Sequence, residues 1–181
     1  MTLPFRVTGH SIRPPPGVVI PSKAPPPGAA DESGLKMLQI EVRSIPLAQT
    51  RALRREVLRP HSSLEDLASH EPEGSVAFGA YDGDELVGVG LVGRDGEGPG
   101  DWRVRGMATK PRARGRGVGT RILQALVQHA VAHGATRVWC NARTPARSLY
   151  ERLGFVVASD EFEPPDIGPH YRMELPVAAP R

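Results

Sequence analysis

The sequence predicts an α/β domain in which a mixed, mostly antiparallel sheet is flanked by helices. Three observations favour this fold class. Segments in which every second residue is apolar, typical of strands, outnumber segments with a helical apolar period. An Asp-Gly turn joins two consecutive strand patterns, and a glycine-rich turn precedes the strongest helical pattern. The chain has 181 residues, which fits one domain because about 100–200 residues is the usual domain length.

The first half of the domain is expected to contain four strands and one helix. Alternating apolar residues indicate half-buried strands, and the amphipathic helix is expected to end before Pro60. The turn Asp82-Gly83-Asp84 is typical of a hairpin. In order, the expected elements are a strand at 38–42, a helix at 47–58, strands at 75–81 and 85–92, and a strand at 102–109.

The second half begins with the strongest helical pattern of the chain, at 118–133. Apolar residues recur at every fourth position from Val118 to Ala130, which places them on one helix face, and Gly134 is suited to end the helix. The remaining expected elements are a strand at 136–141, a helix at 145–153, and strands at 155–158 and 171–175.

Residues 1–34 are expected to be a flexible, proline-rich leader, and residues 35–181 to form the single domain. Repeated prolines hold the leader extended and remove hydrogen-bond donors, and Met37 is an alternative translation start. The single cysteine, Cys140, excludes an internal disulfide and favours a cytoplasmic location. No apolar run approaches the roughly 18 residues of a membrane-spanning helix, so no membrane association is expected.

A basic cluster runs from the strand at 102–109 into the helix that follows it. Such a cluster attracts a polyanion, either a nucleic-acid backbone or a phosphorylated cofactor. The net charge is only +3 and aromatic residues make up 5% of the chain, which leaves little for base stacking. No acidic residue separates its members, which are Arg103, Arg105, Lys110, Arg112, Arg114, Arg116 and Arg121.

The turn before the helix at 118–133 has the features of a phosphate loop. Gly115, Gly117 and Gly119 alternate along it and allow the backbone to approach a ligand closely. The first amides of the following helix have no intrahelical acceptors, and the helix dipole makes that end electropositive. Together these features predict an anion cradle suited to a pyrophosphate.

Two common phosphate loops do not fit this turn. A Walker loop requires Lys and then Ser or Thr after its last glycine, whereas Thr120 and Arg121 follow here. The Rossmann spacing of glycines is also not met. The remaining pattern, Arg-x-x-Gly-x-Gly at Arg114, Gly117 and Gly119, resembles the acetyl-CoA signature of the GNAT N-acetyltransferase superfamily.

A second set of residues extends the resemblance at the distance expected in that superfamily. It consists of Asn141, Ala146, Tyr150 and the pair Gly154-Phe155, and the match covers 101–156 closely and 37–176 loosely. A small bacterial, ElaA-like branch is similar in two further motifs, Arg-Gly-Met-Ala at 105–108 and Gly-Pro-His-Tyr at 168–171.

The resemblance implies a GNAT fold whose fourth and fifth strands separate so that the pantetheine arm enters between them. It also implies an acyl-CoA-dependent N-acyltransferase that moves an acetyl group from acetyl-CoA to a primary amine, by direct attack in a ternary complex and without a metal. The expected cofactor-binding residues are Met107, Ala108, Thr109, Arg114, Gly115, Arg116, Gly117, Val118, Gly119, Thr120 and Asn141. Amides near Met107 and Ala108 are expected to donate to the acetyl carbonyl oxygen.

The resemblance implies that Tyr150 supplies the proton for the departing thiolate, with Ser148 as a weaker substitute. Many relatives place a carboxylate base on the strand before the phosphate loop. That strand carries Arg103 and Arg105 here, so a carboxylate base at this place is not expected.

His170 is the first candidate for the base because an imidazole titrates near neutrality. Glu161, Glu163 and a water chain are alternatives. His129 and His133 are four residues apart but lack the Glu of a zinc protease motif, so no metal site is expected.

Arginines on the acceptor side indicate the chemistry of the acceptor. Arg54, Arg105 and Arg143 can bind a carboxylate because the guanidinium fork matches its geometry. We therefore expect the acceptor to be a small-molecule or peptide amine that bears an anionic group. No nucleic-acid or membrane partner is expected, and a homodimer is a candidate assembly. Two other hypotheses remain: a nucleic-acid-binding module, and a sensor that binds CoA without catalysis and does not need Tyr150.

Overall fold

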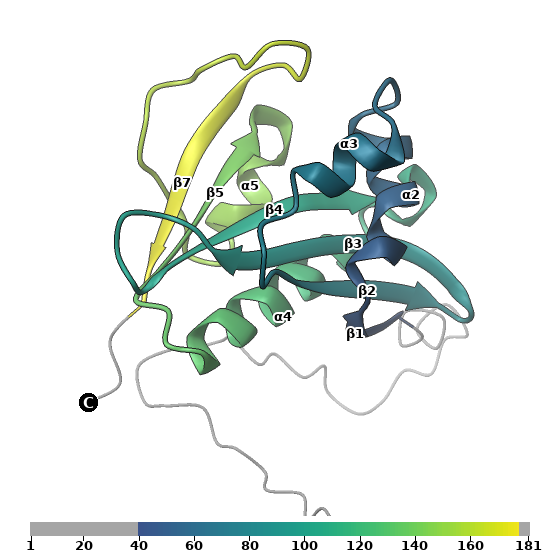
Figure 1. Ribbon diagram of the computed structural model, residues 1–181, viewed down its shortest axis with the longest axis horizontal. Coiled ribbons are helices and arrows are strands. Elements are labelled where there is room, and N and C mark those ends of the chain that lie inside the picture. Colours follow the sequence, from purple (N-terminus) through teal and green to yellow (C-terminus); the bar gives the residue numbers. More distant parts are fainter. Residues whose placement is uncertain (1–39, 178–181) are drawn as a thin grey trace, which may run out of the picture. The chain divides into compact units, whose positions relative to one another are not determined.

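The computed structural model describes residues 40–177 (Figure 1). The expected leader at 1–34 and the first residues of the strand expected at 38–42 lie outside the described residues. The boundary near residue 35 therefore stays a prediction. Within the described range, no helix is long and apolar enough to cross a membrane.

Seven strands form one sheet in the order β1-β2-β3-β4-β5-β7-β6. Neighbouring strands run antiparallel except β4 and β5, which run parallel, so the sheet is mixed and mostly antiparallel as expected. The strands are β1 (Ile40–Ile45), β2 (Val76–Asp82), β3 (Glu85–Arg94), β4 (Asp101–Thr109), β5 (Arg137–Arg143), β6 (Val156–Val157) and β7 (His170–Pro176).

Helices cover both faces of this sheet (Figure 1). The long helix α4 (Val118–Ala132) packs against β2, β3 and β4, and α2 (Leu47–Leu58) packs against the same strands from the other face. Residues of β3 alternate between the two faces: Gly88 and Gly90 face α4, whereas Val89 and Leu91 belong to the core beneath α2.

The short helix α3 (Leu64–Ser69) was not expected from the sequence. Its N-terminus is a capping box, in which the Ser63 hydroxyl accepts from the Asp66 amide and the Asp66 carboxylate accepts from the Ser63 amide, each at 3.0 Å. The helix is too short to show a 3.6-residue periodicity. The chain also forms short turns at η2 (Pro111–Ala113) and η3 (Thr144–Ala146), and α5 (Arg147–Glu151) is shorter than the helix expected at 145–153.

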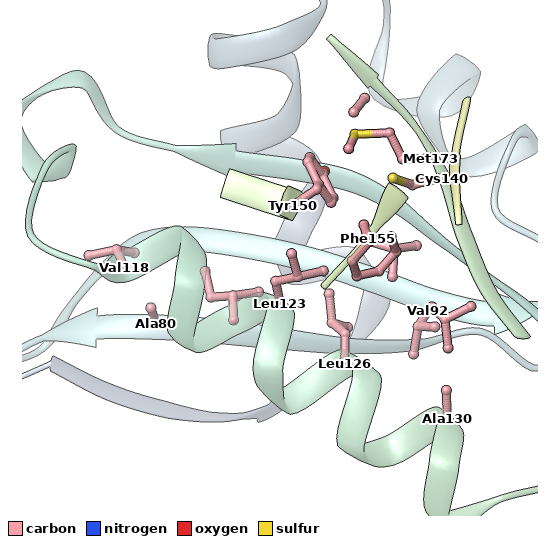
Figure 2. Close-up of a cluster of buried hydrophobic side chains, with 14 of the residues drawn as sticks. Ala80, Val92, Val118, Leu123, Leu126, Ala130, Cys140, Tyr150, Phe155 and Met173 are labelled. Atoms are coloured by element: carbon pink, nitrogen blue, oxygen red, sulfur yellow. The ribbon is translucent and has the colours of Figure 1, made fainter. Parts of the chain in front are cut away.

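The larger core lies between the sheet and α4, as Figure 2 shows. The apolar face predicted from the four-residue spacing is fully buried, with Val118, Leu126 and Ala130 each at most 1% exposed. Two glycines of β3 let the helix approach the strand closely. A Cβ on Gly88 would lie 2.7 Å from Val118 Cγ1, and one on Gly90 would lie 2.8 Å from Leu126 Cδ1.

The parallel pair β4 and β5 is joined only at its beginning. Pairing covers residues 101–103 of β4 and 137–139 of β5 and then stops. Beyond this point β5 continues to pair with β7, whereas β4 continues with β3. The two central strands therefore separate towards their C-terminal ends, as the family resemblance implied.

Candidate active site

A cavity of about 950 Å³ lies where β4 and β5 separate. Its wall combines the turn before α4, the end of β4, the end of β5, the C-terminal part of α2, parts of α3 and α5, and the start of β7. Segments more than 100 residues apart in the sequence, such as Arg54 and His170, meet at this one cavity. A cleft at the C-terminal ends of sheet strands is a common location for ligand sites.

One end of the cavity is formed by the predicted phosphate loop. Gly115 and Gly117 have φ angles of 74° and 76°, a backbone conformation that favours glycine. Gly117 is the N-cap of α4 and no side chain caps this helix. The Arg121 amide makes the first bond along the helix, to the Gly117 carbonyl oxygen at 3.1 Å. The preceding amides are left for a ligand, so the loop fits an anion such as a pyrophosphate.

Most of the basic cluster around this loop is paired with carboxylates from neighbouring strands. Arg116 donates to Asp82 at 2.6 Å, and Lys110 to Glu85 at 2.7 Å. Lys110 and then Arg112 lower the pKa of Glu85 to about 2. The remaining pairs join Arg112 to Glu85, and Arg103 and Arg105 to Asp95. The cluster is therefore a set of ion pairs rather than a free basic face.

Strand β4 contains a bulge at the centre of the cavity. Val89 pairs with Ala108 and Leu91 with Arg105, so Gly106 and Met107 together oppose a single residue of β3. Gly106 has a φ of 59°. The bulge interrupts regular pairing and presents backbone groups at the cavity wall, where Gly106 and Met107 both lie.

Most of the expected cofactor-binding residues are brought together by the fold. Ala108 is buried and lies outside the cavity lining, and Arg116 is held by Asp82. The expected residues that line the cavity are Met107, Thr109, Arg114, Gly115, Gly117, Val118, Gly119, Thr120 and Asn141.

Tyr150 of α5 lines the cavity and also belongs to the buried cluster drawn in Figure 2. It is 5% exposed, and its ring packs edge-on against Phe155 with 5.6 Å between the ring centres. Burial raises the pKa of the Tyr150 phenol well above its usual value, and the nearby Cys140 raises it further. The phenol is therefore protonated at neutral pH.

His170 is placed by the first residue of β7, opposite Arg143 of β5. It is 5% exposed and lines the cavity. Its Nδ1 lies 2.7 Å from the Gly168 carbonyl oxygen. Since a carbonyl can only accept, Nδ1 carries the proton and Nε2 of the neutral ring is the atom with a free lone pair.

The alternative carboxylates are less well placed than His170. Glu161 is exposed and accepts from the Thr144 hydroxyl at 2.8 Å. Glu163 is exposed as well. The described residues that line the cavity include His170 but neither of these two glutamates.

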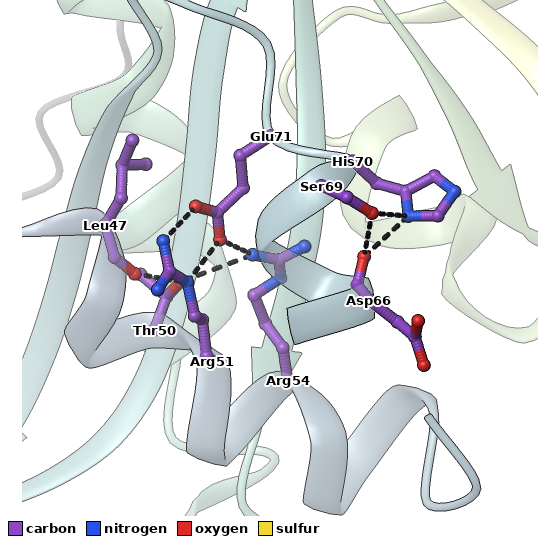
Figure 3. Close-up of polar contacts among 8 residues, drawn as sticks. All are labelled: Leu47, Thr50, Arg51, Arg54, Asp66, Ser69, His70 and Glu71. Atoms are coloured by element: carbon purple, nitrogen blue, oxygen red, sulfur yellow. Dashed lines mark hydrogen bonds and ion pairs between the residues drawn. The ribbon is translucent and has the colours of Figure 1, made fainter. Parts of the chain in front are cut away.

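All three arginines expected on the acceptor side line the cavity. Arg54 donates through Nη1 to Glu71 at 2.6 Å, and Arg51 makes two bonds to the same carboxylate, as Figure 3 shows. Burial opposes the charge of Glu71, but the two guanidinium groups outweigh it and hold the pKa of the carboxyl below its usual value. Arg105 is paired with Asp95, and Arg143 donates to the Leu58 carbonyl oxygen at 2.9 Å.

Sequence reasoning missed several residues of the acceptor side. Arg59, Asp66 and His70 line the cavity, and Glu71 holds Arg54 beside it. His70 Nδ1 is 2.6 Å from the Asp66 carbonyl oxygen, the neighbouring contact in Figure 3. No local motif marks these residues; only the Ser-x-x-Asp capping pattern before α3 pointed to an element in this region.

The other titratable residues singled out in the sequence do not line the cavity. Cys140 lies in the core, and His129 and His133 lie at the C-terminal end of α4. His129 and His133 stack with 4.0 Å between ring centres, and burial lowers the pKa of His129. Burial raises the pKa of the Cys140 thiol to about 12, which disfavours a nucleophilic role. Among residues 40–177, no group of three or more His, Cys, Asp or Glu side chains is arranged to hold a metal ion.

Residues 39–155 match the model of the acetyltransferase (GNAT) family. The uncharacterized N-acetyltransferase YitI of Bacillus subtilis (strain 168) is 29% identical over 140 residues, which are 74% of this chain and 94% of that protein.

Solved structures share the fold. A GCN5-related N-acetyltransferase from Kribbella flavida has a TM-score of 0.62 at 25% identity, over 77% of this chain and 98% of its own. An aminoglycoside 6′-N-acetyltransferase complexed with coenzyme A has a TM-score of 0.65 at 15% identity, over 78% of this chain and 99% of its own.

Proposed function

The chain belongs to the acetyltransferase (GNAT) family and is an acyl-CoA-dependent acyltransferase; from this premise we propose that it transfers the acetyl group of acetyl-CoA to a primary amine. The acceptor is a small molecule or a peptide, and the amine attacks the acetyl group directly while both substrates are bound. One observation carries the proposal: a single cavity joins the phosphate loop to the arginines of the acceptor side, through the gap between β4 and β5.

The phosphate loop is proposed to hold the diphosphate of the cofactor. The amides of Gly115 and Gly117 and those of the first turn of α4 supply the donors, and the helix dipole adds a favourable field. Of the loop arginines, Arg114 is the one best placed to help, because its Nε contacts only the Thr109 carbonyl oxygen at 3.3 Å and it lines the cavity. Asn141 is proposed to contact the cofactor from β5.

The bulge of β4 is proposed to orient the acetyl group. Acetyl-CoA supplies an activated thioester, and the carbonyl oxygen of its acetyl group needs hydrogen-bond donors during attack. The Met107 amide lies in the bulge, opposite no regular partner on β3, and Met107 lines the cavity. This amide is the candidate donor.

Tyr150 is proposed to be the general acid. A donor must remain protonated until the thiolate leaves, and burial keeps the phenol in that form. The side chain lines the cavity from the α5 side, and its ring is fixed against Phe155. The hydroxyl is therefore held in one position beside the gap between the strands.

His170 is proposed to be the general base. Its protonated Nδ1 is fixed by Gly168, which directs Nε2 for proton acceptance. The nearby guanidinium groups assist, because a positive field lowers the pKa of an ammonium group that enters the cavity. An amine that binds here loses its proton more easily than it does in water.

The proposal is tested by two measurements on the purified full chain. Calorimetric titration with acetyl-CoA should show binding, and a library of primary amines should include at least one that releases the thiol of coenzyme A. Binding without turnover of any amine would instead favour a CoA sensor. If acetyl-CoA does not bind, the proposed function is wrong.

A further inference from the structure

The cavity has a large excess of positive charge that acetyl transfer alone does not require. Seven arginines line it, whereas Asp66 is the only acidic residue among the described residues of its wall. The Asp66 carboxylate already accepts from the Ser63 amide in the α3 capping box. The phosphate loop accounts for Arg114, whereas Arg54, Arg59 and Arg143 belong to the C-terminal ends of α2 and β5 and not to that loop.

Arg54 lies beside the β4 bulge with part of its donor capacity unused. It is 7% exposed, and a Cβ on Gly106 would lie 2.7 Å from its Nε, so the guanidinium crosses the bulge closely. Within residues 40–177, this buried Nε has no hydrogen-bond partner. Glu71 compensates only part of the charge here, because it is shared with Arg51. In Figure 3 one terminal nitrogen of Arg54 points away from Glu71, and no dashed line joins it to the other residues drawn.

Arg59, directly after α2, and Arg143, at the end of β5, supply further charge near the C-terminal end of α2. Arg143 donates through Nη2 to the Leu58 carbonyl oxygen, which fixes its guanidinium at the C-terminal end of α2. No ion pair within the described part of the chain involves Arg143 or Arg59. Burial lowers the pKa of Arg143 and the neighbouring Arg59 lowers it further, as expected for cations held close together.

From this arrangement we infer that the acceptor is an amine that carries a carboxylate, such as an amino acid or a peptide with a free carboxylate. Arg54 and Arg143 bind the carboxylate from the two sides of the gap, and the amine is then directed towards the β4 bulge. The inference rests on the proposed N-acetyltransferase function and specifies its substrate class. A polycationic acceptor is disfavoured, because it would place further positive charge among arginines whose charge is compensated only in part.

Arg105 is the third arginine that the sequence placed on the acceptor side. Its guanidinium lines the cavity, but it is paired with Asp95, which it shares with Arg103. Like Arg54, it has a buried Nε without a hydrogen-bond partner in the described range. We assign carboxylate binding to Arg54 and Arg143 because Arg54 crosses the β4 bulge and Arg143 has no carboxylate partner among residues 40–177.

The experiment compares each amino acid with its own carboxamide as acceptor in a thiol-release assay, with spermidine as the polycation. The amide has the lower amine pKa and hence more of the reactive neutral form. A preference for the free acid therefore reports recognition of the carboxylate and not ionisation of the amine. We expect at least one amino acid to exceed its amide in kcat/KM by about tenfold or more, which is typical of charged hydrogen bonds.

Two variants then test which arginines produce the preference for the free acid. Arg143→Gln and Arg54→Gln should each reduce the ratio of acid to amide, through the KM of the acceptor, while the affinity for acetyl-CoA stays the same. Arg55→Gln is the matched control, since Arg55 is exposed on α2 and lies outside the cavity lining. Thermal unfolding identifies any variant that fails to fold. If Arg54→Gln fails to fold, Arg143→Gln alone tests the inference.

The outcomes separate this inference from the function on which it rests. Turnover of only neutral or cationic amines, or equal rates with acids and amides, overturns the inference and leaves acetyl transfer intact. Binding of acetyl-CoA without acetylation of any carboxylate-bearing amine also contradicts it. Absence of acetyl-CoA binding overturns the proposed function itself.

Discussion

The two halves of the cavity are built in different ways. The cofactor half consists of the segment from Met107 to Thr120, which is nearly continuous in the sequence and contributes mainly backbone groups. The acceptor half is built from side chains of α2, α3, β5 and β7, which are separated by long stretches of sequence. A backbone site is determined by a short motif, whereas a side-chain site depends on how distant elements pack.

The comparison also changes the expectation, drawn from the sequence, that the basic cluster beside the glycine turn carries the available positive charge. The arginines next to the phosphate loop are the most conspicuous in the sequence, yet Asp82 pairs with Arg116 and Glu85 with Arg112. The arginines that keep unused charge are Arg54, Arg59 and Arg143, which no motif distinguishes. We therefore expect the cofactor half to bind anions chiefly through amides and the helix dipole, and the acceptor half to bind them through guanidinium groups.

The largest effect is expected from Gly117→Asp. The change places a side chain and a negative charge at the mouth of α4, where the diphosphate is proposed to lie. Binding of acetyl-CoA should be abolished, so that calorimetry detects no heat of binding. Gly134→Asp is the matched control, because Gly134 also has a positive φ, of 87°, and open space around it, but lies beyond the other end of α4. Equal affinity in the two variants would show that the loop is misplaced.

Tyr150→Phe should produce the next largest effect and probes the boundary between the halves. Loss of the phenol should lower kcat by about 10²–10⁴-fold, the usual range for a general acid. Packing on Phe155 is retained, so thermal stability and acetyl-CoA affinity should change little. An unchanged kcat would exclude Tyr150 as the proton donor.

His170→Gln should lower kcat/KM for the amine about 10–100-fold and remove the acid limb of its pH profile. A base must be unprotonated, so the rate of the wild type should fall as the pH drops below the pKa of the base. His61→Gln is the control, since His61 is exposed and lies outside the cavity lining. Retention of the acid limb in His170→Gln would point to a water chain instead.

The smallest effect is expected from Glu85→Gln, which removes a carboxylate that pairs with Lys110 and Arg112. In the folded protein the pKa of Glu85 is about 2, below its ordinary value of 4.5. The charge of Glu85 therefore stabilises the fold fully above pH about 4.5, and this contribution disappears as the pH falls towards 2. Thermal unfolding should show a small loss of stability at pH 7 and almost none near pH 2. Glu56→Gln, an exposed change on α2, should show no such dependence.

The sequence was sufficient for most of the fold because its elements are locally encoded. The bounds predicted for α2 are those observed, and the helix predicted at 118–133 differs from α4 by one residue. The helix α3 was missed because six residues cannot show a helical period, although its Ser63–Asp66 capping box was visible. The expected helix at 145–153 was too long because its first turn is the separate 3-10 turn η3.

The sequence by itself determined the family, the fold class and the glycine turn before α4, because such a turn before an amphipathic helix fixes its own backbone geometry. The tertiary structure decided which charges remain available. Glu71 neutralises part of Arg54, Asp95 pairs with Arg105, and Asp82 pairs with Arg116, although each partner is at least ten residues away in the chain. Electrostatic pairing depends on distance in space, and that distance is set only when helices and strands pack together.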